Sequence, residues 1–156
     1  MTKVNVFWIM LVLFSLASCS SFGDEEVKMN DLNGVWHKNN PQKFEFEIKD
    51  AQNPKNIIFV IRNNNDYPFS NLYLISKISK GNKVLGKIDT LNYVLAMPNG
   101  EWVGSGFGST KETLFQYKVN YKFPENGVYN IELKQAMRKD TLKGIEDIGV
   151  TIQSLK

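Results

Sequence analysis

Apolar and polar residues alternate with a period of two over several stretches of this chain. Residues 43–49 place Phe or Ile at every second position, with Lys or Glu between them, as a half-buried strand does. Residues 115–123 alternate most clearly, residues 124–127 have turn chemistry, and residues 128–133 alternate again, which predicts a hairpin. Residues 57–61 are continuously apolar and rich in β-branched side chains, which predicts a central strand covered on both faces.

Three further strands are predicted at residues 72–75, 91–95 and 148–152. Turn-forming residues separate the strands at 63–66, 80–82 and 98–100. No window shows a helical period, so no helices are available to connect parallel strands. The pattern predicts an all-β domain over residues 31–156, an antiparallel β-sandwich of about eight strands, Ig-like or jelly-roll-like.

The N-terminus has the features of an export signal. Lys3 precedes an unbroken apolar run over residues 6–14, which is too short to span a bilayer, a length of about 20 residues. Residues 16–19 read Leu-Ala-Ser-Cys, the lipobox of bacterial lipoproteins. We therefore predict a signal peptide over residues 1–18 and lipid attachment at Cys19. A buried core cysteine is the alternative, but it would leave the chain without an export signal.

Residues 19–30 are predicted to be an acylated, flexible tether between the lipid and the sandwich. This segment has few large apolar residues and lacks alternation with a period of two. Ser20 is not the aspartate that retains many lipoproteins in the inner membrane, so the outer membrane is favoured. The acidic residues 24–26 are either a surface-export address or a solvated linker. The sequence does not specify the face of the membrane.

The charge pattern argues against nucleic-acid binding. Lys and Arg total 19 against 16 Asp and Glu, and the basic residues are scattered instead of clustered. Hydrophobic residues make up 42% of the chain, which is typical of a globular domain. The single cysteine excludes an internal disulfide, so we expect the sandwich to fold without one.

The sequence predicts no enzyme active site, metal site or cofactor. The only histidine, His37, has no nucleophile motif with it and is expected to be a surface or capping residue. One histidine and one acylated cysteine cannot complete a zinc site, and no EF-hand spacing is present. Residues 104–108 open no helix, so a nucleotide site is not expected there. The glycine-rich stretch of residues 100–110 is expected to form a glycine-relaxed strand, a bulge or a mobile loop.

Residues 62–71 form the densest polar and aromatic cluster of the chain. One interpretation is a sugar platform in which Tyr67 and Phe69 stack on pyranose rings together with Trp102. The favoured interpretation is a turn in which Arg62 pairs with Asp66 while the rings pack on the core or rim. The three rings are the candidate partner-facing or glycan-facing rim.

The two tryptophans of the predicted sandwich are expected to differ in burial. Trp36 precedes the first clear strand and is predicted to lie in the core. Trp102 lies in the glycine-rich stretch, which packs poorly, and is predicted to be at least partly exposed.

These segments together resemble the GldH gliding-motility lipoprotein family, found in bacteria with a type IX secretion system. The resemblance covers essentially the whole chain in order, and the spacing of the motifs is more specific than any one of them. It rests on the lipobox cysteine Cys19, on Trp36, and on residues 44–50, 61–63, 67–72, 99–106, 126–129, 135–138 and 142–149.

The resemblance implies an envelope protein needed for gliding and associated with secretion of surface proteins. It brings no catalytic residues, so only Cys19 receives a chemical role. Two hypotheses follow: a module that binds other gliding or secretion proteins of the envelope, or a module that binds glycan or peptidoglycan. Co-planar exposed rings at Tyr67, Phe69 and Trp102 would favour glycan, and buried rings beside an apolar patch would favour protein.

Overall fold

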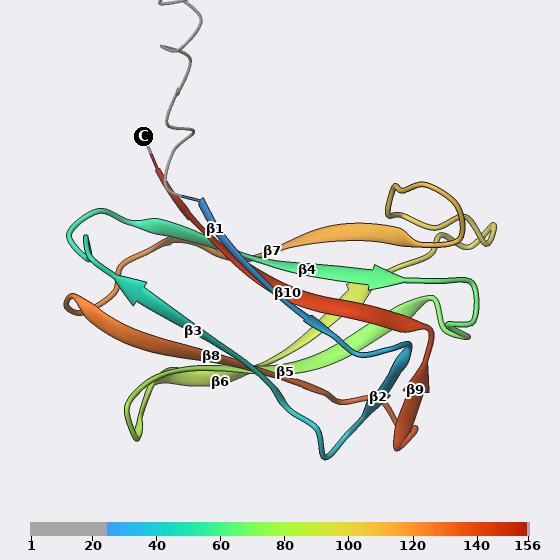
Figure 1. Cartoon of the computed structure of the whole chain (residues 1–156), viewed down its shortest axis with the longest axis horizontal. Coiled ribbons are helices and arrows are strands. Elements are labelled where there is room, and N and C mark those ends of the chain that lie inside the picture. Colours follow the sequence, from blue (N-terminus) through green and yellow to red (C-terminus); the bar gives the residue numbers. More distant parts are fainter. Residues whose placement is uncertain (1–24, 156) are drawn as a thin grey trace, which may run out of the picture.

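The computed structural model describes residues 25–155, which form an all-β sandwich of two main sheets (Figure 1). Its ten strands are β1 (Glu25–Asp31), β2 (Val35–His37), β3 (Gln42–Ile48), β4 (Lys55–Asn63), β5 (Asn71–Lys80), β6 (Lys83–Val94), β7 (Lys111–Tyr121), β8 (Gly127–Gln135), β9 (Thr141–Lys143) and β10 (Ile145–Ser154). The predicted fold class is confirmed. The described residues contain more strands than the eight or so expected, because β2 and β9 have three residues each and are too short to give a clear pattern.

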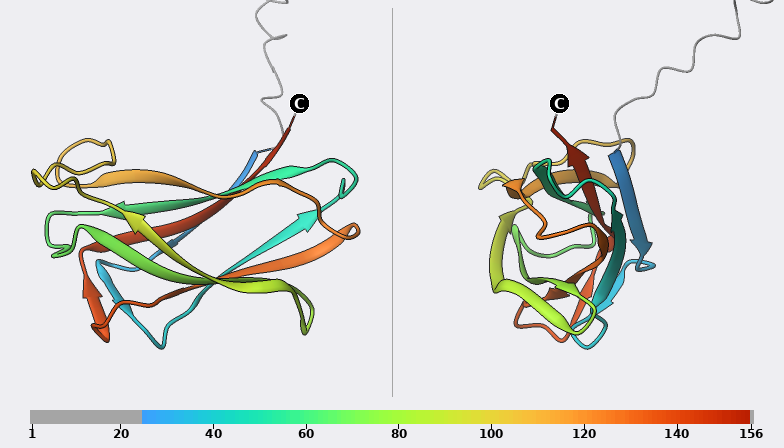
Figure 2. Two further views of the ribbon diagram at one scale, coloured as in Figure 1. Left: turned by 180° about the vertical axis from the view of Figure 1, so that it is seen from behind. Right: turned by 90° about the vertical axis from the view of Figure 1, so that its left-hand side faces the viewer.

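Two four-stranded antiparallel sheets face each other across the core. One sheet has the order β1-β10-β4-β7 and the other β3-β8-β5-β6, while β2 and β9 form a separate two-stranded sheet. Figure 2 shows the two layers from behind and from the end. Every strand pair is antiparallel, as expected for a chain whose described part has no helix to cross over a sheet.

The core follows the alternation seen in the sequence. In β3, Phe44, Phe46 and Ile48 are buried while the residues between them are exposed. β4 is a central strand between β10 and β7, and even Val60 on its outer face is only 4% exposed. Trp36 is fully buried, and its Nε1–H donates to the Asn40 carbonyl oxygen at 2.8 Å, which confirms the core assignment.

The predicted hairpin of residues 115–133 is wrong. β7 pairs with β4 in one sheet, whereas β8 pairs with β3 and β5 in the other. Residues 122–126 therefore carry the chain across the sandwich, with Phe123 buried against the Tyr129 ring at a centroid distance of 4.7 Å. Alternation specifies which side chains face inward, and a turn can join two sheets as readily as two neighbouring strands.

The second half of the predicted tether is also a strand. β1 pairs with β10 along its whole length, from Glu25 to Asp31. Its outer face packs Met29 over Gly149, where a Cβ would lie 2.0 Å from the Met29 sulfur, so only glycine leaves room. Residues 25–31 thus belong to the sandwich, because pairing with β10 supplies what the local pattern of this polar edge strand lacks.

Residues of β1 also close one side of the sandwich. Lys28 donates to the Glu45 carbonyl oxygen of β3, and its ammonium lies 5.1 Å from the Phe46 ring centroid. Asn30 Nδ2 donates to Gln42 Oε1 at 3.0 Å. These contacts join the edge strands of the two sheets, so β1 is part of the domain.

Aromatic stacking between β6 and β7 closes the opposite side. The Tyr93 and Phe115 rings stack at 4.3 Å between centroids. Asp89 accepts from the Tyr117 hydroxyl at 2.7 Å and from Lys118 Nζ at 2.6 Å. These bonds, that of Lys118 foremost, lower the pKa of the Asp89 carboxyl, while desolvation raises the pKa of Tyr93 to about 12.

Both of these edge strands carry bulges. Ser76 pairs with Asp89 and Ile78 with Leu85, so residues 86–88 of β6 all lie opposite Lys77, and Gly86 takes a φ of 71°. The register of β7 on β4 shifts twice between Lys55 and Ile58. Bulges twist an edge and interrupt its row of free N–H and C=O groups, so neither strand presents a regular edge for pairing with another chain.

Candidate functional site

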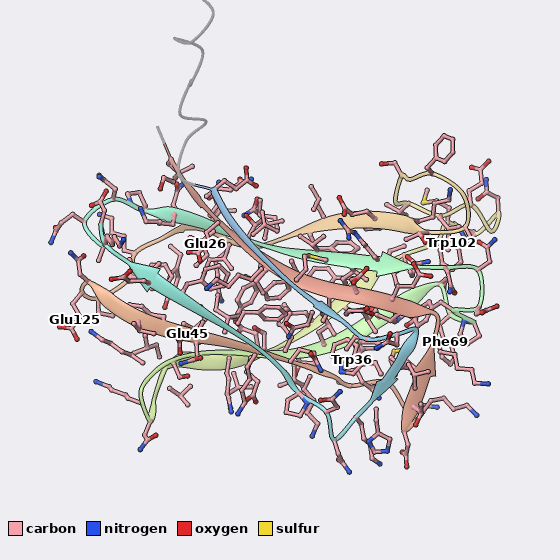
Figure 3. All side chains as sticks on the ribbon, in the orientation of Figure 1. Glu26, Trp36, Glu45, Phe69, Trp102 and Glu125 are labelled. Atoms are coloured by element: carbon pink, nitrogen blue, oxygen red, sulfur yellow. The ribbon has the colours of Figure 1, made fainter. Side chains whose placement is uncertain are left out.

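The loops at one end of the sandwich contain most of the residues that the sequence singled out. Residues 64–70, 95–110 and 136–140 meet there with β2 and β9, and Figure 3 shows Phe69 and Trp102 at this end, opposite Glu125. Asn64 N donates to the Gly144 carbonyl oxygen at 2.9 Å. A Cβ at Gly144 would lie 2.2 Å from Tyr67 N, so a glycine there lets the two loops touch.

Tyr67 is a core residue and does not belong to an exposed rim. Its side chain is only 3% exposed, and its hydroxyl donates to the Asn71 carbonyl oxygen at 2.7 Å. Burial raises the pKa of the Tyr67 hydroxyl well above its usual value. Tyr67 is therefore not part of the predicted rim. Its backbone lies against Gly144, and its ring is buried beneath the loop.

Phe69 and Trp102 are both partly buried, and they do not form a platform with Tyr67. The Phe69 ring meets the Tyr67 ring edge to face, with an interplanar angle of 75°. Trp102 packs against the core, and its Nε1–H donates to Asn65 Oδ1 at 3.0 Å. The rings are thus not co-planar and exposed, which is the arrangement that stacking on sugar faces requires.

The predicted ion pair between Arg62 and Asp66 is wrong as well. Arg62 Nε lies 2.7 Å from Glu112 on β7, and its Nη1 lies 3.7 Å from Asp147 on β10. Cross-strand register places these three residues in one row on the outer face of the sheet, whereas Asp66 lies in the following turn. The bond to Glu112 raises the pKa of the guanidinium, and desolvation raises the pKa of the Asp147 carboxyl.

The glycine-rich stretch is a loop whose residues 105–109 are exposed, although its backbone lies close to the start of β7. Ser105 and Glu112 exchange backbone hydrogen bonds at 2.8 and 3.0 Å. A Cβ at Gly104 would lie 2.4 Å from Thr113 Oγ1, and one at Gly106 would lie 2.3 Å from the Thr110 carbonyl oxygen. Glycine is needed here for close backbone approach, and a strand follows the loop, not a helix.

A groove of about 790 Å³ opens at this end on the outer side of the β3-β8-β5-β6 sheet. The sequence analysis missed most of its lining, which brings together apolar side chains of the 64–70 loop and β5 and the residues that follow β8. The lining residues are Phe69, Tyr73, Ala136, Met137, Arg138 and Lys139. Of the predicted rim, only Phe69 belongs to the groove.

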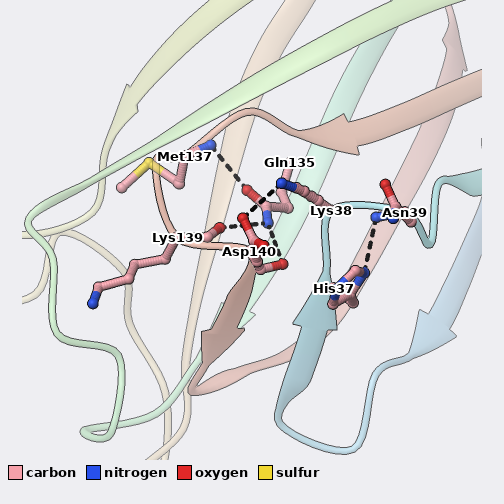
Figure 4. Close-up of polar contacts among 7 residues, drawn as sticks. All are labelled: His37, Lys38, Asn39, Gln135, Met137, Lys139 and Asp140. Atoms are coloured by element: carbon pink, nitrogen blue, oxygen red, sulfur yellow. Dashed lines mark hydrogen bonds and ion pairs between the residues drawn. The ribbon is translucent and has the colours of Figure 1, made fainter.

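Gln135 holds the chain in place where β8 ends and the groove begins (Figure 4). Its side chain is 1% exposed, and its Nε2 donates to the carbonyl oxygens of Lys139 at 3.0 Å and Asp140 at 3.2 Å. Its Oε1 accepts from Met137 N at 2.9 Å. A single buried amide therefore fixes the loop that forms one wall of the groove.

The charges around the groove are mostly positive. Lys38 Nζ lies 2.6 Å from Asp140 Oδ1, so these two opposite charges neutralise each other beside the loop. Lys134, Arg138 and Lys139 are exposed, and none forms an ion pair with a carboxylate among residues 25–155. The mouth of the groove therefore presents cations next to an apolar floor.

His37 is exposed at the end of β2, as predicted, and its Nδ1 accepts from Asn39 N at 3.1 Å (Figure 4). Within the described residues, no cluster of His, Cys, Asp and Glu could hold a metal ion. No helix in this part of the chain is long and apolar enough to cross a membrane. Cys19 and the predicted signal peptide lie outside the described residues.

Comparison with known sequences gives relatives over nearly the full length. The family profile described as GldH lipoprotein matches residues 26–152. A gliding motility lipoprotein GldH homolog from Christiangramia forsetii is 39% identical over 159 residues, covering 97% of this chain and 94% of that one. Gliding motility lipoprotein GldH from Flavobacterium johnsoniae is 36% identical over 129 residues, covering 78% and 79% of the two chains.

Among solved structures, dimeric latent PorU from Porphyromonas gingivalis aligns with a TM-score of 0.39 and 8% identity, over 83% of this chain and 13% of its own.

The GldH lipoprotein family is not known as a family of enzymes. Its profile runs from strand β1 to strand β10, so the match takes in both sheets and the groove between the loops. This chain belongs to the GldH lipoprotein family.

Proposed function

We propose that this chain is a lipid-anchored cell-envelope protein that is needed for gliding motility and acts as a non-catalytic protein-interaction module. The names of both relatives, which describe gliding motility lipoproteins, support this role. Association with type IX secretion of surface proteins is part of the proposal and rests on the family resemblance. The observation that carries the interaction role is the groove, which joins an apolar floor to exposed cations at one end of a rigid sandwich.

The proposed anchor is an acylated Cys19 in the outer membrane. The Leu-Ala-Ser-Cys sequence of residues 16–19 supports acylation, and Ser20 supports release from the inner membrane. Two or more acyl chains attach a protein stably, because each buried methylene contributes about 0.8 kcal/mol. Cys19→Ala should therefore accumulate as an unprocessed precursor without lipid, which intact-mass analysis detects. A mature wild-type chain that starts elsewhere without acyl groups would contradict the anchor.

The geometry favours a protein partner over a glycan. Sugar-binding platforms expose the faces of aromatic rings, but Tyr67 is buried and meets Phe69 edge to face. The groove instead mixes side chains of Phe69, Tyr73 and Met137 with the cations of the following loop. Aromatic, Met and Arg side chains are the types enriched in the centres of protein interfaces.

A gliding assay in a bacterium that lacks its own copy of this protein tests the interaction role. We expect the double variant Arg138→Glu and Lys139→Glu to reach the wild-type protein level and to spread poorly, because the charge at the groove is reversed. Lys83→Glu with Lys122→Glu is the matched control, since it changes the same charge at the opposite end of the sandwich. Equal spreading of both variants would contradict a role for the groove.

A further inference from the structure

The hydrogen-bond ladder between β5 and β8 breaks inside the groove. In a regular antiparallel pair, two opposite residues donate to each other's carbonyl oxygens. Ala136 N donates to the Tyr73 carbonyl oxygen at 2.8 Å, which makes one half of such a pair. Tyr73 N donates to Met137 Sδ at 3.3 Å, so a thioether takes the place of the second carbonyl.

This sulfur is a weak acceptor for a backbone N–H group. The hydrogen bond lies at an exposed position, and both of its residues line the groove, so the Met137 side chain is what separates the Tyr73 N–H from the groove. Gln135 fixes the backbone of Met137, but the Met137 side chain is unbranched and has several rotatable bonds. A better acceptor can therefore displace the sulfur without moving the loop.

The surroundings of this N–H group specify the rest of a ligand. Phe69 and the 40% exposed ring of Tyr73 offer apolar contact beside it. Arg138 and Lys139 line the same groove and form no ion pair among residues 25–155. By contrast, Lys77 on the same sheet lies 2.9 Å from Glu132, so its charge is already neutralised.

We propose that the groove binds a short, extended acidic segment of a partner protein. A backbone carbonyl of the segment replaces the Met137 sulfur at Tyr73 N–H, apolar side chains of the segment lie on Phe69 and Tyr73, and its carboxylates face Arg138 and Lys139. This inference rests on the proposed interaction role and names the class of partner. β5 is paired with β6 on its other side, and the Tyr73 carbonyl oxygen already accepts from Ala136 N, so the segment makes one main-chain hydrogen bond, at Tyr73 N–H. The flanking apolar side chains and cations supply the rest of the affinity and the specificity.

Two observations favour a peptide over an anionic polysaccharide. The Tyr73 N–H faces the position that the carbonyl of a neighbouring strand takes in a regular ladder, and an extended peptide can place a carbonyl there. Phe69 and Tyr73 place an apolar surface beside the cations, and a peptide supplies the apolar side chains that a polyanionic sugar lacks.

The test uses the full-length protein in detergent and fluorescent peptides. The probe DVEIDVE alternates acidic and apolar residues, KVKIKVK replaces every acid with lysine, and alginate oligosaccharide provides carboxylates without a peptide backbone. We expect fluorescence anisotropy to detect binding of DVEIDVE but not of KVKIKVK, and we expect no competition by alginate. Strong competition by alginate, or equal binding of both peptides, would overturn the proposal.

Variants separate the two parts of the proposed contact. Arg138→Gln with Lys139→Gln should weaken DVEIDVE binding about tenfold, because two charge pairs are lost. Lys83→Gln with Lys122→Gln should leave it unchanged. Met137→Leu keeps the volume but cannot accept a hydrogen bond, so binding should become roughly two- to threefold tighter. Weaker binding by Met137→Leu would mean that the sulfur supports the ligand and does not compete with it.

Nuclear magnetic resonance of protein labelled with nitrogen-15 at its tyrosines provides a direct readout. The chain has 6 tyrosines, so the Tyr73 amide can be assigned with a Tyr73→Phe variant. Binding of DVEIDVE should shift the Tyr73 amide proton to higher frequency, as its acceptor changes from sulfur to oxygen. An unshifted Tyr73 amide in the bound state would overturn the proposed contact at Tyr73 N–H, while the gliding phenotype of the groove variants would still test the interaction role separately.

Discussion

Replacing Trp36 with alanine should cause the largest loss of stability of any tryptophan substitution in the described domain. Trp36 is 0% exposed, and its indole N–H donates to the Asn40 carbonyl oxygen at 2.8 Å. It belongs to β2, which pairs only with β9, so few other contacts hold this strand in place. The side chain is therefore the main attachment of the small sheet to the core.

The magnitude follows from burial and hydrogen bonding. An aromatic side chain buries about 150–250 Å², which corresponds to about 4–6 kcal/mol at 25 cal/mol per Å². Measured losses for removing a buried aromatic side chain are about 3–5 kcal/mol, including the cavity. The Asn40 carbonyl also loses its donor. The expected loss is about 4–5 kcal/mol, a large part of a domain stability of about 5–15 kcal/mol.

Urea unfolding followed by circular dichroism measures this loss, with two control variants. Trp36→Phe keeps a ring but not the donor, so it should cost about 1–3 kcal/mol. Trp102→Ala removes a ring that is partly exposed and a bond to Asn65, so it should cost about 1–2 kcal/mol. If Trp102→Ala unfolded at lower urea than Trp36→Ala, the 95–110 loop, and not β2, would be the main closure of this end of the core.

Four further predictions concern backbone space, ionisation and metal. Gly144→Ala should destabilise by at least about 1–2 kcal/mol, because φ is +80° and the new Cβ would meet Tyr67 N at 2.2 Å, and the thermal midpoint measures it. The pKa of Asp89 is lowered, so its stabilising contribution is present at neutral pH and is lost as pH falls through its folded pKa; Asp89→Asn should lower the midpoint at neutral pH but not in acid. The pKa of Asp147 is raised by desolvation, so its ionised form opposes folding at neutral pH, and Asp147→Asn should raise the midpoint there, an effect that fades as pH falls through the folded pKa. Excess chelator should leave the midpoint unchanged, and a drop of several degrees would reveal a structural metal ion.

The sequence predicted the strands well and their partners less well. A period of two identifies which side chains face inward, and Phe44, Phe46 and Trp36 are buried as expected. It does not tell which strand lies alongside, so β7 and β8 were assigned to one hairpin although they belong to different sheets. The strand β1 was missed because its own residues show no alternation. It forms a strand through pairing with β10, which is distant in sequence.

The candidate site was harder to predict because long-range geometry creates it. Tyr67 and Phe69 are close in sequence, yet only Tyr67 is fully buried, at a place where its backbone touches Gly144 of a distant segment. Met137 and Arg138 carried no local signal, and they line a groove because β8 ends at Gln135 while β5 continues beside it.

The proposed lipid on Cys19 would limit the distance that the groove can reach, because strand β1 is already part of the sandwich at Glu25. Between these two residues the chain spans at most about 20 Å, even when fully extended. β1 then runs from Glu25 to Asp31, toward the groove end, and adds a further length of about 20 Å. The groove therefore samples only a layer within roughly 50 Å of the bilayer.

Confinement to such a layer raises the effective concentration of the groove toward partners in the same membrane. A segment presented at that height meets the groove far more often than a freely diffusing one, so a weak contact is sufficient. Weak contacts dissociate quickly, so the groove could exchange its partner segment rapidly. Lengthening the tether would dilute the groove, whereas shortening it would press the sandwich against the lipid headgroups.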